Sequence, residues 1–390
     1  MGKIEIDHTG SGGGITLSSD GTSLLLGGTA IGGGGADLYA AETTGSTDPT
    51  ATGTLSLAIG SSASASSNDG VAIGTQAEAN GTDKCVAIGY DAHANSTNGS
   101  FAFGTATRAT SNMSMALGFQ ANCGGIGAVA AGYTANAGAT FSTAIGFNAK
   151  TETGSNSTAL TNSYASGADS FAAAIANNTS TYGATGANSV AIGPQAKATG
   201  QRSFAATYGV SNNQYSIAFG PCVADQARTF SSGFDAGAYE EGKFARSSGS
   251  FNSSSYGQAQ YGLLVLRSDT TNATAEALTS NNSAASTTNQ IILQNNSAFA
   301  FHGTIVARQK AGDGTASAAW KVEGLIRREG SAGTTVLVNS ATTVLDNTPS
   351  WGMALSADTT NGGLKIEVTG AASTNIRWVA TIHTSEVIYA

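Results

Sequence analysis

The sequence predicts an all-β protein in which a solenoid of short coils precedes a C-terminal antiparallel β-sandwich or jelly roll. A repeat, mostly of 14 or 15 residues, covers residues 51–230. Within each repeat apolar residues alternate with small ones, which is typical of strands. After residue 260 the strand-like segments become longer. We therefore divide the 390-residue chain into an N-terminal segment (1–50), the repeats (51–230), a neck (231–260) and a C-terminal domain (261–390).

Composition narrows the class of protein. Charged residues make up 11% of the chain, against about 25% in ordinary domains, and Pro occurs only 4 times. Val, Ile, Phe and Leu recur at fixed places, which separates the chain from disordered sequences. The net charge is −8 without a basic cluster, which argues against nucleic-acid binding. Cys85, Cys123 and Cys222 lack the paired spacing of metal sites, so we expect small buried side chains.

The N-terminal segment alternates apolar and polar residues between glycine-rich turns, which predicts two or three short strands. The tract Gly32–Gly35 is expected to be a hinge, and the segment before it to attach to a larger assembly. We find no signal region at the start and no apolar run long enough for a membrane helix. We therefore expect assembly in a cytoplasm without membrane insertion.

Most repeats start with a bulky residue, Ala, a second bulky residue and Gly. The first positions are Leu57, Val71, Val86, Phe101, Met115, Val129, Thr143, Thr158, Ala173, Val190, Phe204 and Ile217. Gly allows a turn that other residues resist, and a second alternation follows, as in Ala77 and Ala79. Each unit is thus strand, turn, strand, turn, and such coils must stack to bury a core.

The alternation also predicts how the coil is packed. We expect the bulky residues to face the interior and the alanines of position two to form an outward row. A flat row of alanines would let sister chains approach closely, most simply as a homotrimer. The predicted contact residues are Ala72, Ala87, Ala102, Ala116, Ala130, Ala144 and Ala191.

The repeat resembles the head repeats of YadA-type trimeric adhesins. The stretch Ser189–Gly193, followed by Ala196 and Ala198, carries this resemblance most clearly, and weaker copies extend it over residues 55–230. It implies a left-handed parallel β-roll and a trimer. Thr161 and Ala176 depart from it where Gly is expected, and an insertion before Val190 predicts a bulge or a protruding loop.

The C-terminal domain reads as about eight strands joined by hairpin turns, without a helical period. The expected strands are residues 261–267, 290–293, 299–309, 318–328, 334–345, 351–356, 363–368 and 376–389. The stretches YGLLVLRSDTTNATAEAL, FAFHGTIVARQ, WKVEGLIRREG, LSADTTNGGLKIEVTG and IRWVATIHTSEV resemble the C-terminal domains of bacteriophage fibre proteins. The resemblance implies trimer registration, receptor contact, or both.

No catalytic motif appears in the chain, so we expect no enzyme, no cofactor and no metal. The four histidines lie far apart in the sequence. Glu240 and Glu241 could be offered as an acid/base pair, but adjacent residues of a strand point in opposite directions. We interpret them as part of a solvated turn.

Aromatic residues offer candidate contacts with a receptor. Tyr90, Phe119, Tyr133 and Phe147 each follow the Gly of position four, which predicts a column on successive coils. Such a column could stack on sugars of a host surface or pack between coils or chains. Trp351 and Trp378 could likewise line a glycan site or pack in the core. Packing is the favoured alternative for both sets.

The leading hypothesis for function is a homotrimeric bacteriophage tail fibre, a structural component of the virion. Its N-terminal segment would bind tail or capsid proteins, and its C-terminal domain would bind a surface glycan or outer-membrane receptor. A capsid-decorating fibre and a bacterial trimeric surface adhesin are alternatives. A tailspike that degrades polysaccharide is a further alternative, and it would need paired carboxylates in a groove.

Overall fold

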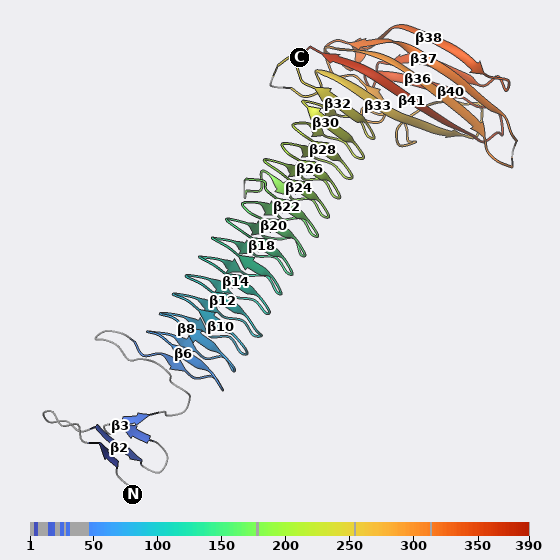
Figure 1. The fold of residues 1–390 in the computed structure, drawn as a ribbon. Helices are drawn as coiled ribbons and strands as arrows, with labels where there is room; N and C mark the ends of the chain where they lie inside the picture. The colour runs from blue at the N-terminus through green and yellow to red at the C-terminus, as the bar shows by residue number, and fades with distance from the viewer. Residues whose placement is uncertain are drawn as a thin grey trace. The chain divides into compact units, whose positions relative to one another are not determined.

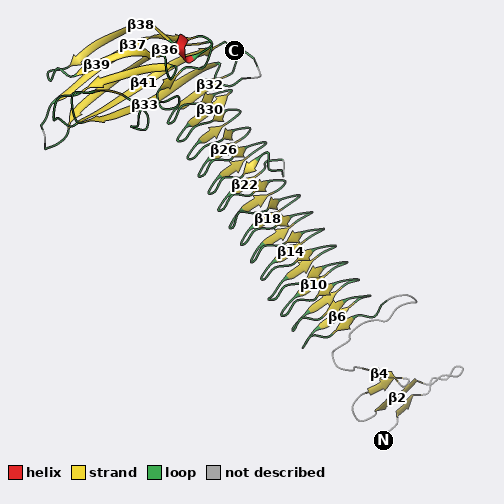
Figure 2. Ribbon diagram, turned by 180° about the vertical axis from the view of Figure 1, so that it is seen from behind, coloured by secondary structure: helices red, strands yellow, loops and turns green. Residues whose placement is uncertain are grey.

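The computed structural model describes residues 47–176, 179–252, 255–312 and 314–389, and the backbone of four short strands before residue 32. Those strands are β1 (Ile4–Ile6), β2 (Ile15–Ser19), β3 (Leu24–Leu26) and β4 (Thr29–Ile31), paired antiparallel in that order. The tract Gly32–Gly35 lies outside the described residues. The chain forms two compact units, Met1–Asn162 and Ser163–Ala390. Strands make up nearly all regular structure, which confirms the all-β prediction (Figure 2).

Two parallel sheets form the coils of the first unit (Figure 1). The A sheet contains β6 (Leu57–Ile59), β8 (Val71–Ile73), β10 (Val86–Ile88), β12 (Phe101–Phe103), β14 (Met115–Leu117), β16 (Val129–Ala131), β18 (Thr143–Ile145) and β20 (Thr158–Leu160). The B sheet contains β5 (Thr50–Ala51), β7 (Ser64–Ala65), β9 (Glu78–Ala79), β11 (His93–Ala94), β13 (Arg108–Ala109), β15 (Asn122–Cys123), β17 (Asn136–Ala137) and β19 (Lys150–Thr151). Equivalent residues pair in register, as Ala87 does with Ala72. The predicted coil of two strands and two turns is confirmed.

The second unit begins with further coils of the same kind. Its A strands are β22 (Phe171–Ala173), β24 (Val190–Ile192), β26 (Phe204–Ala206), β28 (Ile217–Phe219), β30 (Phe230–Phe234) and β32 (Phe244–Ser248). Its B strands are β21 (Tyr164–Ala165), β23 (Gly183–Ala184), β25 (Lys197–Ala198), β27 (Val210–Ser211), β29 (Val223–Ala224) and β31 (Gly237–Ala238). The coils therefore continue beyond residue 230, up to Ser248.

One repeat copy starts two residues earlier than the sequence pattern suggested. Phe171 pairs with Val190 and Ala172 with Ala191, so position one is Phe171 and not Ala173. The error arose because Ala occupies both positions two and three of this copy. Where small residues follow one another, the sequence does not show which of them belongs to which position of the repeat.

The interior of each coil is filled by small side chains, which reverses the predicted packing. The alanines of position two are fully buried in a single chain; they are Ala72, Ala87, Ala102, Ala116, Ala130, Ala144 and Ala191. The prediction that they form an outward contact row is wrong. The bulky residues of positions one and three, such as Phe101 and Phe103, are instead partly exposed. In the first unit, two strands joined by tight turns enclose only Ala, Ser, Cys and Thr side chains, whereas the second unit also buries Ile175.

Glycine at position four is required by geometry. Gly104 has a φ of +127°, and a Cβ atom built on it would lie 1.9 Å from the carbonyl oxygen of Gly118 in the next coil. No side chain fits at such a distance, so Gly permits the close stacking of turns. Thr161 keeps a positive φ of 37° where Gly is missing.

The C-terminal domain is a sandwich of two antiparallel sheets, which confirms the predicted fold. The larger sheet has the order β33 (Ala259–Thr270), β41 (Ile376–Ile388), β36 (Ser297–Gln309), β37 (Ser317–Arg328) and β38 (Val336–Asp346). In the smaller sheet β40 (Gly363–Thr369) pairs with β39 (Gly352–Asp358), β34 (Ala275–Ala277) and β35 (Ile291–Ile292). Side chains such as Leu264, Phe299 and Ile366 form one core. The short strand β34 was not expected from the sequence.

The A sheet of the second unit runs directly into the larger sheet of the sandwich. The last coil strand, β32, pairs antiparallel with β33, and Phe244 lies opposite Leu263. The outward face of the coils therefore continues onto the outward face of the sandwich, where Phe244 contacts Tyr261.

Candidate functional site

The two outward faces of the coils differ in chemistry. The A face carries the bulky residues of positions one and three, and Leu117 is 47% exposed. The B face of the first unit carries polar or charged side chains at the first position of its strands; they are Thr50, Ser64, Glu78, His93, Arg108, Asn122, Asn136 and Lys150. The polar B face is suited to solvent exposure, whereas a continuous apolar surface such as the A face indicates a site of contact with another molecule.

An ion-pair network lies on the B face. The Nδ1 and Nε2 atoms of His93 lie 3.1 Å from Glu78 and 2.8 Å from Asp91, and Arg108 lies 3.1 Å from Asp91. The hydrogen bond with His93 and the guanidinium of Arg108 lower the pKa of Asp91 despite some burial. These groups are partly exposed, so the network contributes little to stability.

The predicted aromatic column forms over three successive coils. The ring centroids of Phe119 and Tyr133 lie 5.1 Å apart, and those of Tyr133 and Phe147 lie 5.5 Å apart, with nearly parallel planes. Tyr90 is exposed two coils away from Phe119, and Thr105 holds the equivalent position between them. Because the stacked rings cover each other's faces, the inner ring offers an edge rather than a platform for a sugar.

The two tryptophans offered as glycan contacts lie in the core of the sandwich. Trp351 is 5% exposed and Trp378 is fully buried. The indole of Trp378 donates a hydrogen bond to Thr270 over 2.9 Å and stacks on Trp320. Neither side chain can reach a receptor. The prediction that they contact a glycan is therefore wrong, and the alternative prediction of core packing is confirmed.

A buried charged cluster joins the last coil to the sandwich. The Nζ atom of Lys243 lies 3.0 Å from Glu240 and 2.8 Å from Glu386, and all three side chains are at most 2% exposed. The Glu386 carboxylate also accepts hydrogen bonds from Gln260 over 2.6 Å and Thr384 over 2.6 Å. The interpretation of Glu240 as part of a solvated turn is therefore wrong. Glu241 lies closer to the surface and pairs with Arg228.

Sequence reasoning missed this cluster, although one signal pointed to it. Lys243 directly precedes an A strand, where most other coils carry a small hydroxyl residue and the rest carry Gly70, Cys85 or Ala128. The hydroxyl residues are Ser56, Ser100, Ser114, Ser142, Ser157, Ser170, Ser189, Ser203, Ser216 and Thr229. A lysine in this buried slot requires an acidic partner. The partner Glu386 stands 143 residues further along the chain.

Gln260 occupies the place of a further rung of the B sheet. Its side-chain amide accepts a hydrogen bond from the Gly237 N–H over 2.8 Å and donates one to the Gly237 carbonyl over 2.9 Å. Burial raises the pKa of Glu240 to about 7. Burial opposes the charge of Lys243, but the nearby carboxylates outweigh it and raise the pKa of that ammonium. The cluster thus caps the end of the solenoid.

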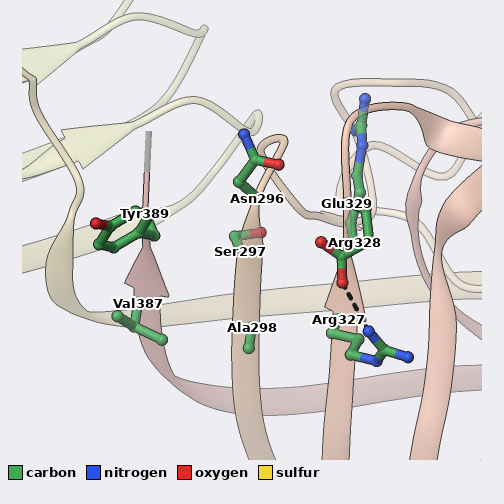
Figure 3. Close-up of a pocket in the computed structure, with 8 residues that line it drawn as sticks. All are labelled: Asn296, Ser297, Ala298, Arg327, Arg328, Glu329, Val387 and Tyr389. Carbon is green, nitrogen blue, oxygen red and sulfur yellow. Dashed lines mark hydrogen bonds and ion pairs between the residues drawn. The ribbon is translucent and has the colours of Figure 1, made fainter.

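A surface pocket of about 570 Å³ lies at the strand ends of the larger sheet. Figure 3 shows Arg327 directed toward Glu329, and the two are 2.6 Å apart. The exposed ring of Tyr389 and the amide of Asn296 line the same hollow. An aromatic ring beside a fixed polar pair suits recognition of a small polar ligand. This site could not be predicted from the sequence, because its residues come from three separate strand ends.

The described ranges contain no group of three or more His, Cys, Asp or Glu side chains placed to hold a metal ion. No helix within those ranges is both long and hydrophobic enough to span a bilayer. Cys85, Cys123 and Cys222 are buried and free, as predicted, and burial raises the pKa of Cys222 to about 11.

The coils and the terminal sandwich define a fibre-like β-roll protein. Four parts of the chain match the family model of the YadA head domain repeat; they are residues 51–83, 86–107, 124–149 and 184–206. These matches agree with the resemblance found in the sequence. No curated protein matches the chain.

Two solved structures are similar to the chain. The tailspike protein gp49 of Acinetobacter baumannii bacteriophage Fri1, described as a capsular polysaccharide depolymerase, is 9% identical with a TM-score of 0.23. The match covers 89% of this chain, and the chain spans 59% of the length of that tailspike. The tailspike protein of Acinetobacter phage vB_ApiP_P1 is 11% identical with a TM-score of 0.24, over 90% of this chain and 81% of that one.

Proposed function

We propose that the protein is a homotrimeric bacteriophage tail fibre that attaches the virion to a host-cell surface. The observation that carries this proposal is the contrast between the apolar A face and the polar B face. Parallel copies around a common axis would bury their A faces against one another and leave the B faces in water. The YadA head repeats support the proposal, because they mark a fibre-like β-roll.

The parts of the chain then take separate roles. The N-terminal segment binds tail or capsid proteins, and the hydrogen-bonded coils form a stiff spacer. The sandwich contacts a surface glycan or an outer-membrane receptor, and the pocket of Asn296, Arg327 and Tyr389 is its most suitable contact. Several copies would turn weak single contacts into firm attachment.

The proposal includes the absence of enzymatic activity. The carboxylates of Glu240 and Glu386 are buried, and both contact the Lys243 ammonium. A glycosidase would need such groups on either side of a bound sugar. Incubation with capsular polysaccharide or lipopolysaccharide of the host, followed by measurement of new reducing ends, tests this part. Release of oligosaccharides would establish a tailspike enzyme instead.

The YadA match favours a second candidate, a bacterial trimeric surface adhesin. Light scattering first tests the oligomer, and we expect a mass three times the chain mass of 38.6 kDa. Antibody labelling then separates the candidates, because a tail fibre is found on purified virions and an adhesin on the cell envelope. Labels on both termini distinguish a tail fibre from a capsid-decorating fibre and give its orientation.

A further inference from the structure

Three consecutive coils of the first unit expose far more apolar surface than their neighbours. Within residues 113–147, each of the following side chains is at least 38% exposed: Met113, Met115, Leu117, Phe119, Ile126, Tyr133, Phe141, Ile145 and Phe147. Elsewhere among the described residues of this unit, the large apolar side chains with similar exposure are Leu55 and Tyr90. We call residues 113–147 the apolar belt.

The apolar belt also lacks charge around the entire coil. No Asp, Glu, Lys, Arg or His occurs between Arg108 and Lys150. Charged side chains on the surface of soluble proteins oppose association, and few charged residues occur at the centre of protein–protein interfaces. Charge and exposure therefore independently indicate that another protein surface covers this part of the coils.

Both edges of the A face are apolar within the belt. Met113 and Phe119 flank β14, and Phe141 and Phe147 flank β18, each two residues from the strand. Phe141 is held against the neighbouring coil, since a Cβ atom at Gly127 would lie 2.7 Å from its ring. Ordered aromatic side chains lose little entropy in a contact.

The same edge positions in other coils of this unit are mostly small or polar. They are Leu55 and Ser61 beside β6, Asp69 and Thr75 beside β8, Lys84 and Tyr90 beside β10, Gly99 and Thr105 beside β12, and Asn156 and Asn162 beside β20, so none of these coils is apolar on both edges. The two apolar edges thus occur together, at one level of the coils. In a cyclic assembly one edge of each copy meets the opposite edge of the next. Parallel copies in register require both edges to be apolar at the same level, whereas staggered or antiparallel copies do not.

We propose that the apolar belt fixes the register between neighbouring copies of this chain. The edge of Phe119, Tyr133 and Phe147 packs on the edge of Met113 and Phe141 of the next copy. The proposal rests on the proposed homo-oligomeric fibre and adds where its copies align. The occupant is a second copy because the belt continues the A face that the fibre already buries.

A photo-crosslinking amino acid at position 133 of the full chain tests the register. Trypsin cuts after Arg108 and Lys150, so the belt is released as one peptide. We expect Tyr133→p-benzoylphenylalanine to join the belt peptides of two copies. The matched control is Tyr90→p-benzoylphenylalanine, at the same coil position outside the belt, which should not reach the belt peptide. Crosslinks from position 133 to peptides of other coils would overturn the proposal.

Charged substitutions on the edges separate this proposal from the proposed function. We expect Phe141→Asp and Phe147→Asp to weaken association at least about tenfold, because an unpaired carboxylate is buried in the contact. The control is Asn162→Asp, which lies at the position of Phe147 in a coil with polar edges. It should change the strength of association less than about twofold. Circular dichroism checks that each variant folds. A monomeric wild-type chain would refute the fibre, whereas a trimer unaffected by both Phe variants would refute only the belt.

Discussion

Replacing Lys243 by Met should destabilise the C-terminal domain severely. The ammonium lies within 3.0 Å of Glu240 and 2.8 Å of Glu386, and no solvent reaches these groups. At a pH above about 7, where Glu240 is ionised despite its raised pKa, removing the cation leaves two carboxylates in the interior without a counter-charge. Breaking a buried ion pair in this way costs about 3–5 kcal/mol of unfolding free energy.

The assay is urea unfolding followed by tryptophan fluorescence. All three tryptophans, Trp320, Trp351 and Trp378, are buried in the sandwich core, so their emission reports on this domain. The matched control is Arg228→Met, which removes a cation from the exposed side of the same coils. Its guanidinium is 61% exposed where it pairs with Glu241, and loss of such a pair costs about 0–1 kcal/mol.

A double variant identifies the cause of the loss. If the orphaned carboxylates are responsible, adding Glu386→Gln to Lys243→Met should restore part of the stability, because one buried charge is removed. The reasoning fails if Lys243→Met lowers the unfolding free energy no more than Arg228→Met does. It also fails if the second substitution only adds to the loss.

Other outcomes concern the pH dependence and the coil interior. Burial raises the pKa of Glu240 from 4.5 to about 7. Its contribution to stability is therefore complete below pH 4.5 and is lost as the pH rises through 7. In Glu240→Gln, the urea concentration at the midpoint of unfolding should depend less on pH over that range. Gly104→Ala should cost about 1–3 kcal/mol, because its φ of +127° and a contact at 1.9 Å exclude a Cβ atom. Gly124→Ala, with no atom within 4 Å, should stay within about 0.5 kcal/mol in the same thermal unfolding, and equal losses would contradict the stacking argument. Ala116→Leu should cost about 1–3 kcal/mol by overfilling the coil, whereas Met115→Leu on the outward face should be nearly neutral; hydrogen exchange of β14 amides distinguishes them.

The period of the sequence was sufficient to predict the coil, because stacked strands repeat the same local chemistry. It did not reveal which face lies inside. Alternation shows that Val86 and Ile88 share one face and Ala87 the other, but either face satisfies the pattern. The space inside the coil decides the matter. A coil of the first unit returns on itself within about 15 residues and encloses its two strands so closely that its buried side chains are small, and Val86 and Ile88 stay partly exposed.

The charged cluster and the surface pocket could not be predicted from local patterns. Lys243 and Glu386 meet because β41 returns through the sandwich to lie beside β33, next to the last coil. Adjacency in the sequence drew attention to Glu240 and Glu241 instead, which have separate partners. Contacts of this kind depend on the topology of the whole domain.

The position of the cluster connects the fold with the proposed function. A solenoid ends in unpaired strand edges, which need a cap to avoid pairing with other chains. At the C-terminal end, β33 covers the A sheet and the Gln260 amide pairs with the last B strand. The same connection carries the outward A face onto the sandwich without a break. Copies that bury their A faces would therefore bring their sandwiches together, and the receptor-binding ends of a fibre would be held side by side.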